Sequence, residues 1–534
     1  MIAPTKDPQE VAAREVFDGP APCPSRRAAG PRLTRMGVRV HHLLVLIILV
    51  AGALRFYRPE SWPVFLDEDG YTQAALELMV PWDEATRRAF DAAYGKPPLA
   101  FFLQAWLVPL TGDPVVAGRV LSAASGTVTT ALCFFLGRRL GGPPVGLVAA
   151  TIYGLSPIAV LHERMVLQDG PLTAFATGAL LLSCAAIQGG SWRLGSVAAI
   201  LGAVAVQFKV PGVMVAILPL ASLSIPGCPL WRRVGPAVLA AIGPVASYGS
   251  LMWGPMGPGL ARQNHDRVAE PFSHFGALSH ELLRTVMAYF PAGLAAFILI
   301  GLVLALHYKP RLAAVFTTAV LAWSLPWLVV GNFAPSRYYL PAVPYVCAFV
   351  GLALVRLLSA AATLGRAPAG LIGTVAAAIV AASGIASVQL AVSHRTAPMS
   401  PQDNGQYRSG WPSGYGYAEA AQLISANAER GSAVAYVVDP AHRAAVGLYG
   451  HLPAGVASLG AFHPPEQVRL VYRGPVYVIV GDGVHDPDGR QSLREVLARE
   501  PQLQMLAHFP RPDSDRGVSV LWRPPLPEYG QPRE

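Results

Sequence analysis

The sequence predicts a polytopic α-helical membrane protein with a small α/β domain at its C-terminal end. The chain has 534 residues, of which 53% are hydrophobic and only 14% are charged, whereas an average soluble domain has about 25% charged residues. Long apolar runs recur up to about residue 392, and shorter β-rich runs follow them. Basic residues lie at the ends of the apolar runs, so the net charge of +9 indicates membrane topology and not a nucleic-acid-binding patch.

The N-terminal segment, residues 1–37, is rich in Pro and Ala, and we expect it to be disordered in the cytoplasm. The first apolar run, "HHLLVLIILVAGALRF", follows several arginines and has no small-residue cleavage site after it. It therefore predicts an uncleaved first span. Four of the five cysteines lie in or beside apolar runs without CxxC spacing, so we expect neither disulfides nor a zinc ribbon.

About eleven spans follow from the rule that about 20 apolar residues cross a bilayer. With the N-terminus inside, every short cytoplasmic loop is basic, as membrane topology requires. The membrane domain then covers 38–392, with a long external loop at 58–113. The apolar run 97–112 is predicted to lie on or partly in the outer membrane surface, because counting it as a span would invert all later loops. The expected spans are 39–57, 115–137, 142–160, 170–187, 194–208, 210–225, 234–253, 286–307, 312–331, 338–358 and 370–392.

The last part of the chain, 393–534, changes in character and is placed outside the membrane by the same parity. Strand candidates "AVAYVVD", "PVYVIVGDG" and "GVSVLWR" alternate with helix candidates "GYAEAAQLISANAER" and "RQSLREVLARE". This alternation predicts a small extracytoplasmic α/β domain. The aromatic residues near its start could stack on a sugar or anchor the chain at the interface.

A second set of polar residues falls on the predicted outer side of the membrane. Outer loops are usually poor in Lys and Arg, yet cations here lie near the outer ends of several spans. They could therefore converge on one site near the outer leaflet. The set consists of Asp67, Glu68 and Asp69, then Lys96, Arg119, Asp169 in "HERMVLQDG", Lys209, Arg262 and Arg267 in "RQNHDR", and Arg337.

Each of these residues also has a structural explanation. Asp67, Glu68 and Asp69 suit the start of a helix, where carboxylates bind free N–H groups and complement the helix dipole. Asp169 precedes Gly-Pro and an apolar run, which is an N-cap arrangement. The lysines and arginines could keep their charges at the membrane interface while their stems are buried. Only the joint pattern favours a functional site.

A carboxylate beside several cations at the outer membrane surface indicates chemistry on a lipid phosphate. The carboxylate can take a proton from an acceptor hydroxyl, while Lys and Arg neutralise a departing phosphate. Because a phosphate leaving group is a weak base, one carboxylate suffices, unlike the paired carboxylates of most glycosidases.

A series of motifs follows the acidic pair in a defined order. They are "DE" at Asp67 and Glu68, "KPPL" from Lys96, "GRVLSAASGTVTTALCFFLGRRLGG", "SP" with "ER" and "QDG" up to Gly170, "FKVPG" and "SRYYLPAVP". Together they resemble the protein mannosyltransferases and lipid A aminoarabinose transferases, glycosyltransferase family 39 and its relatives, which have the GT-C fold. The resemblance covers about residues 40–360 and is strongest in the first 210.

The resemblance implies a transferase that takes a sugar from a polyprenyl-phosphate carrier. It makes Asp67 the catalytic base and Glu68 the second member of the acidic pair. It places Lys96 where the family contacts the lipid phosphate and matches Asp169 to the acidic residue that begins the fourth span. Gly95 stands where the aminoarabinose transferases carry an acidic residue, which argues against aminoarabinose and against a metal at that position. The resemblance names no cofactor, and a divalent metal stays open.

The leading hypothesis is direct displacement with inversion at the anomeric carbon. Asp67 activates a hydroxyl of a protein, lipid or glycan acceptor, and Lys96, with Lys209, Arg267 or Arg337, stabilises the released lipid phosphate. The expected location is the plasma or inner membrane, with membrane lipids and no nucleic acid as partners. The alternatives are a lipid or solute transporter, which would place charges near the bilayer midplane, and an inactive scaffold with the same fold.

Overall fold

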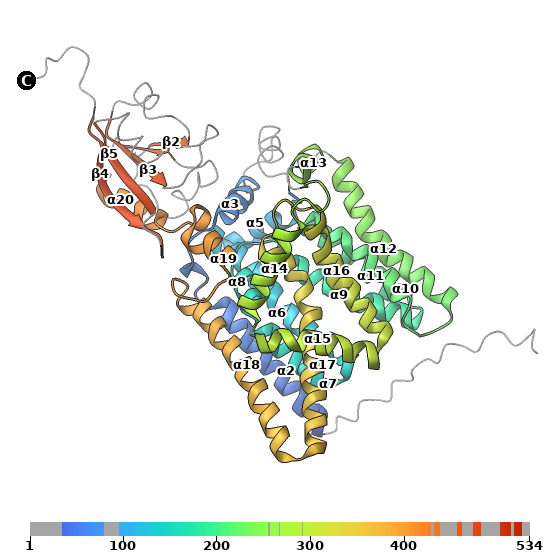
Figure 1. Cartoon of the computed structure of the whole chain (residues 1–534). Helices are drawn as coiled ribbons and strands as arrows, with labels where there is room; N and C mark the ends of the chain where they lie inside the picture. The colour runs from blue at the N-terminus through green and yellow to red at the C-terminus, as the bar shows by residue number, and fades with distance from the viewer. Residues whose placement is uncertain are drawn as a thin grey trace, which may run out of the picture.

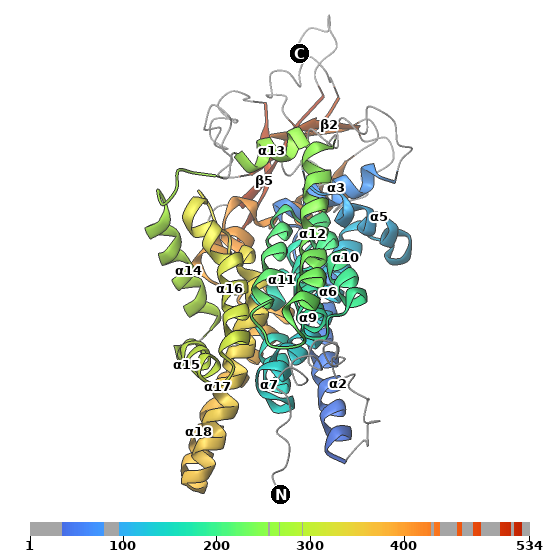
Figure 2. The same cartoon turned by 90° about the vertical axis from the view of Figure 1, so that its right-hand side faces the viewer.

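The computed structural model of the chain consists mainly of helices, with a five-stranded sheet near the C-terminal end (Figure 1). The structure describes residues 35–79, 96–254, 257–265, 268–290, 292–428, 432–437, 457–461, 474–481, 502–513 and 517–525. The segment 1–37, expected to be disordered, lies almost entirely outside these residues. Figure 2 shows that α3 (Leu66–Glu77) and α13 (Gly257–His265) lie at the end of the helical body nearest the sheet, and α7 (Pro143–Gly154) lies toward the other end.

Seven helical stretches in the described part of the chain are long and apolar enough to cross a membrane. A bent pair, α14 (Phe275–Tyr289) and α15 (Ala292–Tyr308), turns by 108° and could supply an eighth. The seven are α2 (Arg35–Phe56), α6 (Pro114–Gly141), α9 (Asp169–Gly189), α12 (Leu230–Trp253), α16 (Pro310–Val330), α17 (Val343–Leu364) with the preceding turn η3 (Ser336–Ala342), and α18 (Arg366–Val392). The chain is therefore a multi-pass membrane protein.

Shorter helices occupy the other predicted spans. The span expected at 142–160 is instead α7 followed by α8 (Pro157–His162), and the break lies just before Pro157 because proline disfavours the helical conformation of the residue that precedes it. The two spans expected between 194 and 225 are α10 (Trp192–Phe208), the 3₁₀ segment η2 (Val210–Ala216) and α11 (Ile217–Ser222). Helix is present at each expected position, and seven or eight of these stretches in the described part of the chain are long and apolar enough to span by themselves; the expected count of about eleven stays a prediction.

The apolar run 97–112 forms α5 (Leu99–Thr111), which packs against α6 and α3. Its 13 residues give a length of about 20 Å, which is less than the roughly 30 Å hydrocarbon core. Trp106 and Leu110 are 70% and 73% exposed. The helix is thus too short to be a span by itself, in keeping with the predicted surface helix.

A buried ion pair fastens α2 to the segment that follows α8. Arg55 Nε lies 2.7 Å from Glu163 Oε2, and both side chains are fully buried. The Tyr153 hydroxyl donates to the same carboxylate at 2.5 Å. Gly126 on α6 makes room for the pair, since a Cβ there would lie 2.2 Å from Glu163 Oε2. The "ER" motif therefore has a structural role in this helical body.

Short helical turns connect the spans to the sheet. Trp62, after the turn η1 (Pro59–Ser61), donates from its indole to the Leu390 carbonyl at 3.2 Å and so ties the first external loop to α18. After α18 come α19 (Pro401–Asn404), the π-helical turn η4 (Gly405–Ser409) and η5 (Trp411–Ser413). These turns pack beside the start of α3, where the Tyr407 ring contacts the Phe65 ring.

The sheet has the strand order β2-β1-β3-β5-β4. β1 pairs in parallel with β2 and β3, and β5 pairs antiparallel with β3 and β4. The helix α20 (Tyr417–Asn427) packs its buried face against β3 and β5. β1, β3 and β5 coincide with the expected strands, β2 and β4 were not expected, and the helix expected at 490–500 lies outside the described residues. The strands are β1 (Ala433–Val437), β2 (Ala457–Ala461), β3 (Val476–Gly481), β4 (Gln504–Pro510) and β5 (Gly517–Arg523).

Candidate active site

The three consecutive carboxylates at the start of α3 point into different surroundings. Phe65 is the N-cap residue, and its N–H donates to Glu68 Oε2 at 2.9 Å, which is the carboxylate half of a capping box. Glu68 and Asp69 are 0% and 2% exposed. Asp67 retains 21% exposure of its side chain and lines a cavity. The first turn of α3 thus carries, at adjacent positions, a capping carboxylate and a carboxylate that reaches open space.

Glu68 is held in a buried, two-pronged ion pair. Arg119 on α6 donates from Nε to Glu68 Oε1 and from Nη2 to Oε2, both at 2.8 Å. The Val166 N–H donates to Oε1 at 2.7 Å. Arg119 also donates to the carbonyls of Pro59, Trp62 and Pro63. Glu68 therefore fixes the external loop and α3 onto the helical body, and it does not line the cavity.

The cavity beside Asp67 has a volume of about 280 Å³ and joins charged groups to an aromatic wall. Arg337 Nη2 donates to Asp67 Oδ2 at 2.6 Å, and the guanidinium is nearly buried. Arg337 Nη1 donates to the Tyr407 hydroxyl at 3.1 Å. The other lining residues include Tyr71, Lys96, Gln168, Lys209, Met214, Tyr248, Leu260, Trp323, Trp327 and Tyr338.

Two lysines face the same cavity, each paired with an aromatic ring. Lys96 Nζ donates to the Tyr71 hydroxyl at 2.8 Å and lies 4.1 Å from the centre of that ring. Lys209 Nζ lies 2.7 Å from Asp169 Oδ1 and 4.1 Å from the centre of the Tyr338 ring. Burial and the nearby Asp67 carboxylate raise the pKa of Tyr71 well above its usual value. Tyr71 thus stays a neutral hydroxyl beside Lys96.

A second cavity, of about 480 Å³, shares Asp67, Arg337 and Tyr338 with the first. Its other walls come from α3, from the segment before η3 and from the turns after α18. These walls carry amides and aromatic rings, and among the described residues Asp67 is the one carboxylate that lines the cavity. They are formed by Phe65, Leu66, Asn332, Phe333, Gln402, Gly405, Gln406, Gly410 and Pro412. Asp67 therefore stands where two cavities of different composition meet.

A buried hydrogen-bond network locks this wall in place. Ser336 Oγ donates to Asp403 Oδ1 at 2.5 Å and lies 3.1 Å from His162 Nε2. The Tyr289 hydroxyl donates to Asp403 Oδ2 at 2.6 Å. Burial by itself would raise the pKa of Asp403, but the hydrogen bonds from its neighbours outweigh burial and lower that pKa below the usual value. Since Ser336 precedes Arg337, the network fixes the guanidinium that pairs with Asp67.

The chain is similar to known membrane glycosyltransferases in sequence and in fold. Residues 95–253 match the family model described as dolichyl-phosphate-mannose-protein mannosyltransferase, and no curated protein matches the sequence. ArnT from Cupriavidus metallidurans, solved bound to undecaprenyl phosphate, matches with a TM-score of 0.54 and 16% identity over 91% of this chain and 98% of that chain. AglB from Archaeoglobus fulgidus, an oligosaccharyltransferase solved with an inhibitory peptide and a dolichol-phosphate, matches with a TM-score of 0.51 and 12% identity over 82% of this chain and 69% of that chain.

The chain has the GT-C glycosyltransferase fold. This fold agrees with the resemblance of the motifs, which covers about residues 40–360. The structural match to ArnT extends over 91% of the chain.

Within this GT-C fold, four of the predicted site residues line one cavity. Asp67, Lys96, Lys209 and Arg337 do so, and Asp169 contacts Lys209 from the start of α9. Glu68, predicted as catalytic, lies instead in the buried pair with Arg119. Arg267, predicted to bind the lipid phosphate, lies outside the described residues. Among the described residues, no group of three or more His, Cys, Asp or Glu side chains is placed to hold a metal ion.

Several residues of the site were not expected from the sequence. Tyr71 follows Asp67 by four residues and so shares its face of α3, a spacing that the sequence does show. Gln168 lines the cavity and is 3% exposed, and its Nε2 has no partner among the described residues. No local sequence signal identifies Asp403 or Tyr407, which lie in the turns that follow α18 in the chain and reach back to Ser336 and Arg337.

Proposed function

We propose that this protein is a membrane glycosyltransferase that moves a sugar from a polyprenyl-phosphate carrier to an acceptor hydroxyl at the outer face of the membrane. The observation that carries this proposal is the position of Asp67 at the junction of two cavities. One cavity has three cations and an aromatic wall, which suit a lipid phosphate and its sugar. The relatives in the comparison that bind undecaprenyl phosphate or a dolichol-phosphate support a carrier of this kind.

Charge balance within the first cavity favours an uncharged sugar. Both nearby carboxylates already have cationic partners, Asp67 with Arg337 and Asp169 with Lys209. A phosphate would complete the neutralisation of the three cations, whereas the ammonium group of an amino sugar would find no unneutralised anion. The buried Gln168 amide and the tyrosine hydroxyls offer hydrogen bonds to sugar hydroxyls. An assay with a panel of polyprenyl-phosphate sugars identifies which hexose or pentose is transferred.

Donor binding would also activate the base. A carboxylate held by a guanidinium at 2.6 Å is a weak base, because the cation stabilises its charged form. An incoming phosphate competes for Arg337 and so releases Asp67 to accept the proton of the acceptor hydroxyl. The attacking oxygen then displaces the carrier phosphate with inversion, and Lys96, Lys209 and Arg337 stabilise the phosphate that leaves.

The second cavity would receive the acceptor. Gln406 from the turns after α18 and Asn332 before η3 contribute neutral amides to its lining. The Gln402 amide, also in this lining, accepts from the Ser336 N–H and donates to the Ala334 carbonyl, which fixes that wall. Amides of this kind bind the hydroxyl groups of sugars and other polyols without requiring a charge on the ligand. We therefore place the hydroxyl to be glycosylated on this side of Asp67, opposite the carrier.

The test is a transfer assay with purified protein, a panel of radiolabelled polyprenyl-phosphate sugars and cell-envelope acceptors. Asp67→Asn should reduce product formation at least about 100-fold, since general-base catalysis contributes about 10²–10⁴-fold, and should leave folding and polyprenyl-phosphate binding largely intact. The control is Glu60→Gln, which removes an exposed carboxylate from the same external loop. Full turnover by Asp67→Asn would refute the assignment. A flippase would move intact donor and form no sugar–acceptor product, so the assay also tests the transport alternative.

A further inference from the structure

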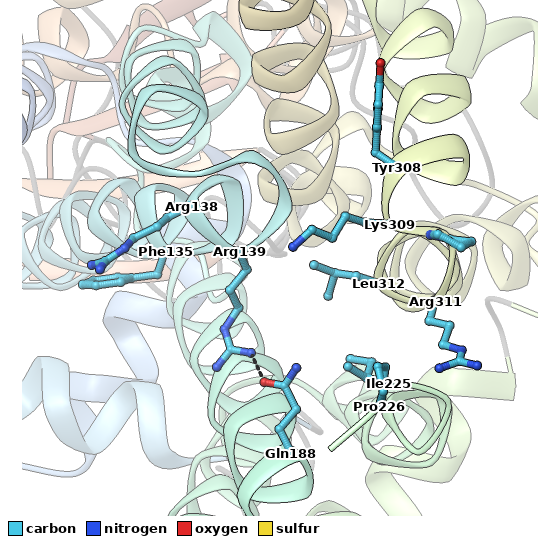
Figure 3. Close-up of a pocket in the computed structure, with 11 residues that line it drawn as sticks. Phe135, Arg138, Arg139, Gln188, Ile225, Pro226, Tyr308, Lys309, Arg311 and Leu312 are labelled. Atoms are coloured by element: carbon cyan, nitrogen blue, oxygen red, sulfur yellow. Dashed lines mark hydrogen bonds between the residues drawn. The ribbon is translucent and has the colours of Figure 1, made fainter. Parts of the chain in front are cut away.

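A recess with a volume of about 850 Å³ lies at the end of the helical body opposite to the active site. It opens between the C-terminal ends of α6 and α9, the segment before α12 and the junction of α15 with α16. Its lining residues are Phe135, Arg138, Arg139, Gln188, Ile225, Pro226, Tyr308, Lys309, Pro310, Arg311 and Leu312 (Figure 3). Nothing in the glycosyl-transfer mechanism uses this recess.

The recess is strongly positive. Four cations from two separate helix junctions line it, and no carboxylate among the described residues does. Arg139 Nη1 donates to the Gln188 Oε1 atom at 3.0 Å, so α9 fixes the direction of this guanidinium. Figure 3 shows Lys309 extending toward the Arg139 side of the recess, while Arg138 and Arg311 point outward at the edges.

The helix dipole favours only half of these charges. Arg138 and Arg139 occupy the last turn of α6, where a cation complements the negative end of the helix dipole. Lys309 and Arg311, in contrast, lie at the N-terminal and therefore positive end of a helix dipole. Lys309 is the N-cap of α16 and Arg311 lies in its first turn, which has no acidic residue and no side-chain cap. Cations at the positive end of a 21-residue helix are unfavourable unless an anion lies between them and the backbone N–H groups.

The surroundings of the recess favour a lipid as the source of this anion. Its floor includes the buried side chains of Ile225 and Leu312, and its rim includes Phe135 and Tyr308, which are 44% and 48% exposed. Arg356 stacks on the Tyr308 ring at 4.2 Å and adds a further positive charge. We propose that this recess binds the phosphate headgroup of an anionic phospholipid, with Lys309 and Arg139 as its main contacts and the apolar rim against its acyl chains.

The experiment measures lipid binding to the purified full-length chain, independently of glycosyl transfer. Retention of phosphatidylglycerol, phosphatidylcholine and inorganic phosphate is compared by native mass spectrometry and by thermal stabilisation in detergent. The test variant is Arg139→Gln with Lys309→Gln. The matched control is Arg193→Gln with Arg366→Gln, which removes two exposed cations that do not line the recess.

The wild-type protein should bind phosphatidylglycerol in preference to phosphatidylcholine. The test variant should bind phosphatidylglycerol roughly 30-fold more weakly, because each of the two lost cations contributes about 1 kcal/mol to binding of an anionic lipid. The control should bind phosphatidylglycerol as the wild type does. Equal binding by the test variant would overturn the proposal, and so would an equal loss in the control. Stabilisation by inorganic phosphate alone, with no preference between the lipids, would overturn the lipid as the source of the phosphate.

Discussion

Neighbouring residues in the acidic triplet have separate tasks. Asp67 lies at the junction of two cavities and contacts Arg337, while Glu68 has no exposure and holds Arg119 with both oxygens. Removing one partner of a buried ion pair leaves the other charge without compensation and costs far more than breaking an exposed pair. The acidic pair therefore combines one carboxylate that lines two cavities, which we propose as the base, with one buried carboxylate that positions α3.

Substituting Glu68→Gln tests this division. The variant keeps the size of the side chain but leaves the buried Arg119 charge uncompensated, so we expect a loss of about 3–5 kcal/mol in the free energy of unfolding. Thermal unfolding in detergent measures it, and Glu60→Gln, which removes a carboxylate from an exposed ion pair with Arg58, is the control that should unfold near the wild-type temperature. Wild-type stability in Glu68→Gln, combined with lost transfer, would instead return Glu68 to a catalytic role.

At the scale of elements, the turns after α18 complete the active site. Tyr407 accepts a hydrogen bond from Arg337, and Asp403 binds Ser336 and Tyr289. His394 joins the same junction to the first external loop, because its Nε2 lies 3.1 Å from the Ser61 carbonyl and the Tyr415 hydroxyl lies 3.3 Å from its Nδ1. The junction beside the site thus joins segments that are 333 residues apart in the chain, and the ion pair of the site itself joins Arg337 to Asp67 across 270 residues.

The protonation of His394 predicts how this junction responds to pH. Burial, with help from the Arg395 guanidinium, lowers the pKa of His394 to about 4, whereas an unfolded histidine titrates near about 6.5. Between these values the unfolded chain binds a proton that the folded chain excludes. The contribution of His394 is therefore fully present above about pH 6.5 and is lost progressively as the pH falls toward about 4.

Thermal unfolding of the wild type and of His394→Gln between pH 7.5 and pH 5 measures this effect. The wild type should lose stability as the pH falls, and the variant, which keeps a side-chain donor for the Ser61 carbonyl, should show a flatter pH dependence. Parallel curves for the two proteins would show that His394 does not sense pH in this range.

At the scale of the whole molecule, the reactive groups gather at the end of the helical body nearest the sheet, and the basic recess lies at the other end. α6 links the two ends, since its Arg119 supports the external loop and its Arg139 lines the recess. This polarity fits the predicted orientation, in which the basic loops are cytoplasmic and the sheet lies outside.

Truncation tests which part of the C-terminal region the active site needs. A chain that ends after Gly416 keeps α19 and η4 and should retain donor binding. A chain that ends after Val392 loses the Asp403 and Tyr407 contacts to η3, so it should lose transfer and have a lower unfolding temperature. Donor binding and unfolding temperature are measured on both proteins in the same detergent. Equal behaviour of the two truncated chains would show that the network is dispensable.

The sequence by itself determined the membrane class, the approximate positions of the helices, and four polar residues that prove to line one cavity, Asp67, Lys96, Lys209 and Arg337. It could do so because burial in lipid demands long apolar runs and makes every charge outside the basic loops conspicuous. Only the tertiary structure decided that Glu68 pairs with Arg119, and that α7 and α8 are separate helices. It also decided that Asp403 binds Ser336 and that Tyr407 accepts a hydrogen bond from Arg337. These assignments depend on contacts between distant segments, and the geometry of such contacts leaves no periodic signal in the local sequence.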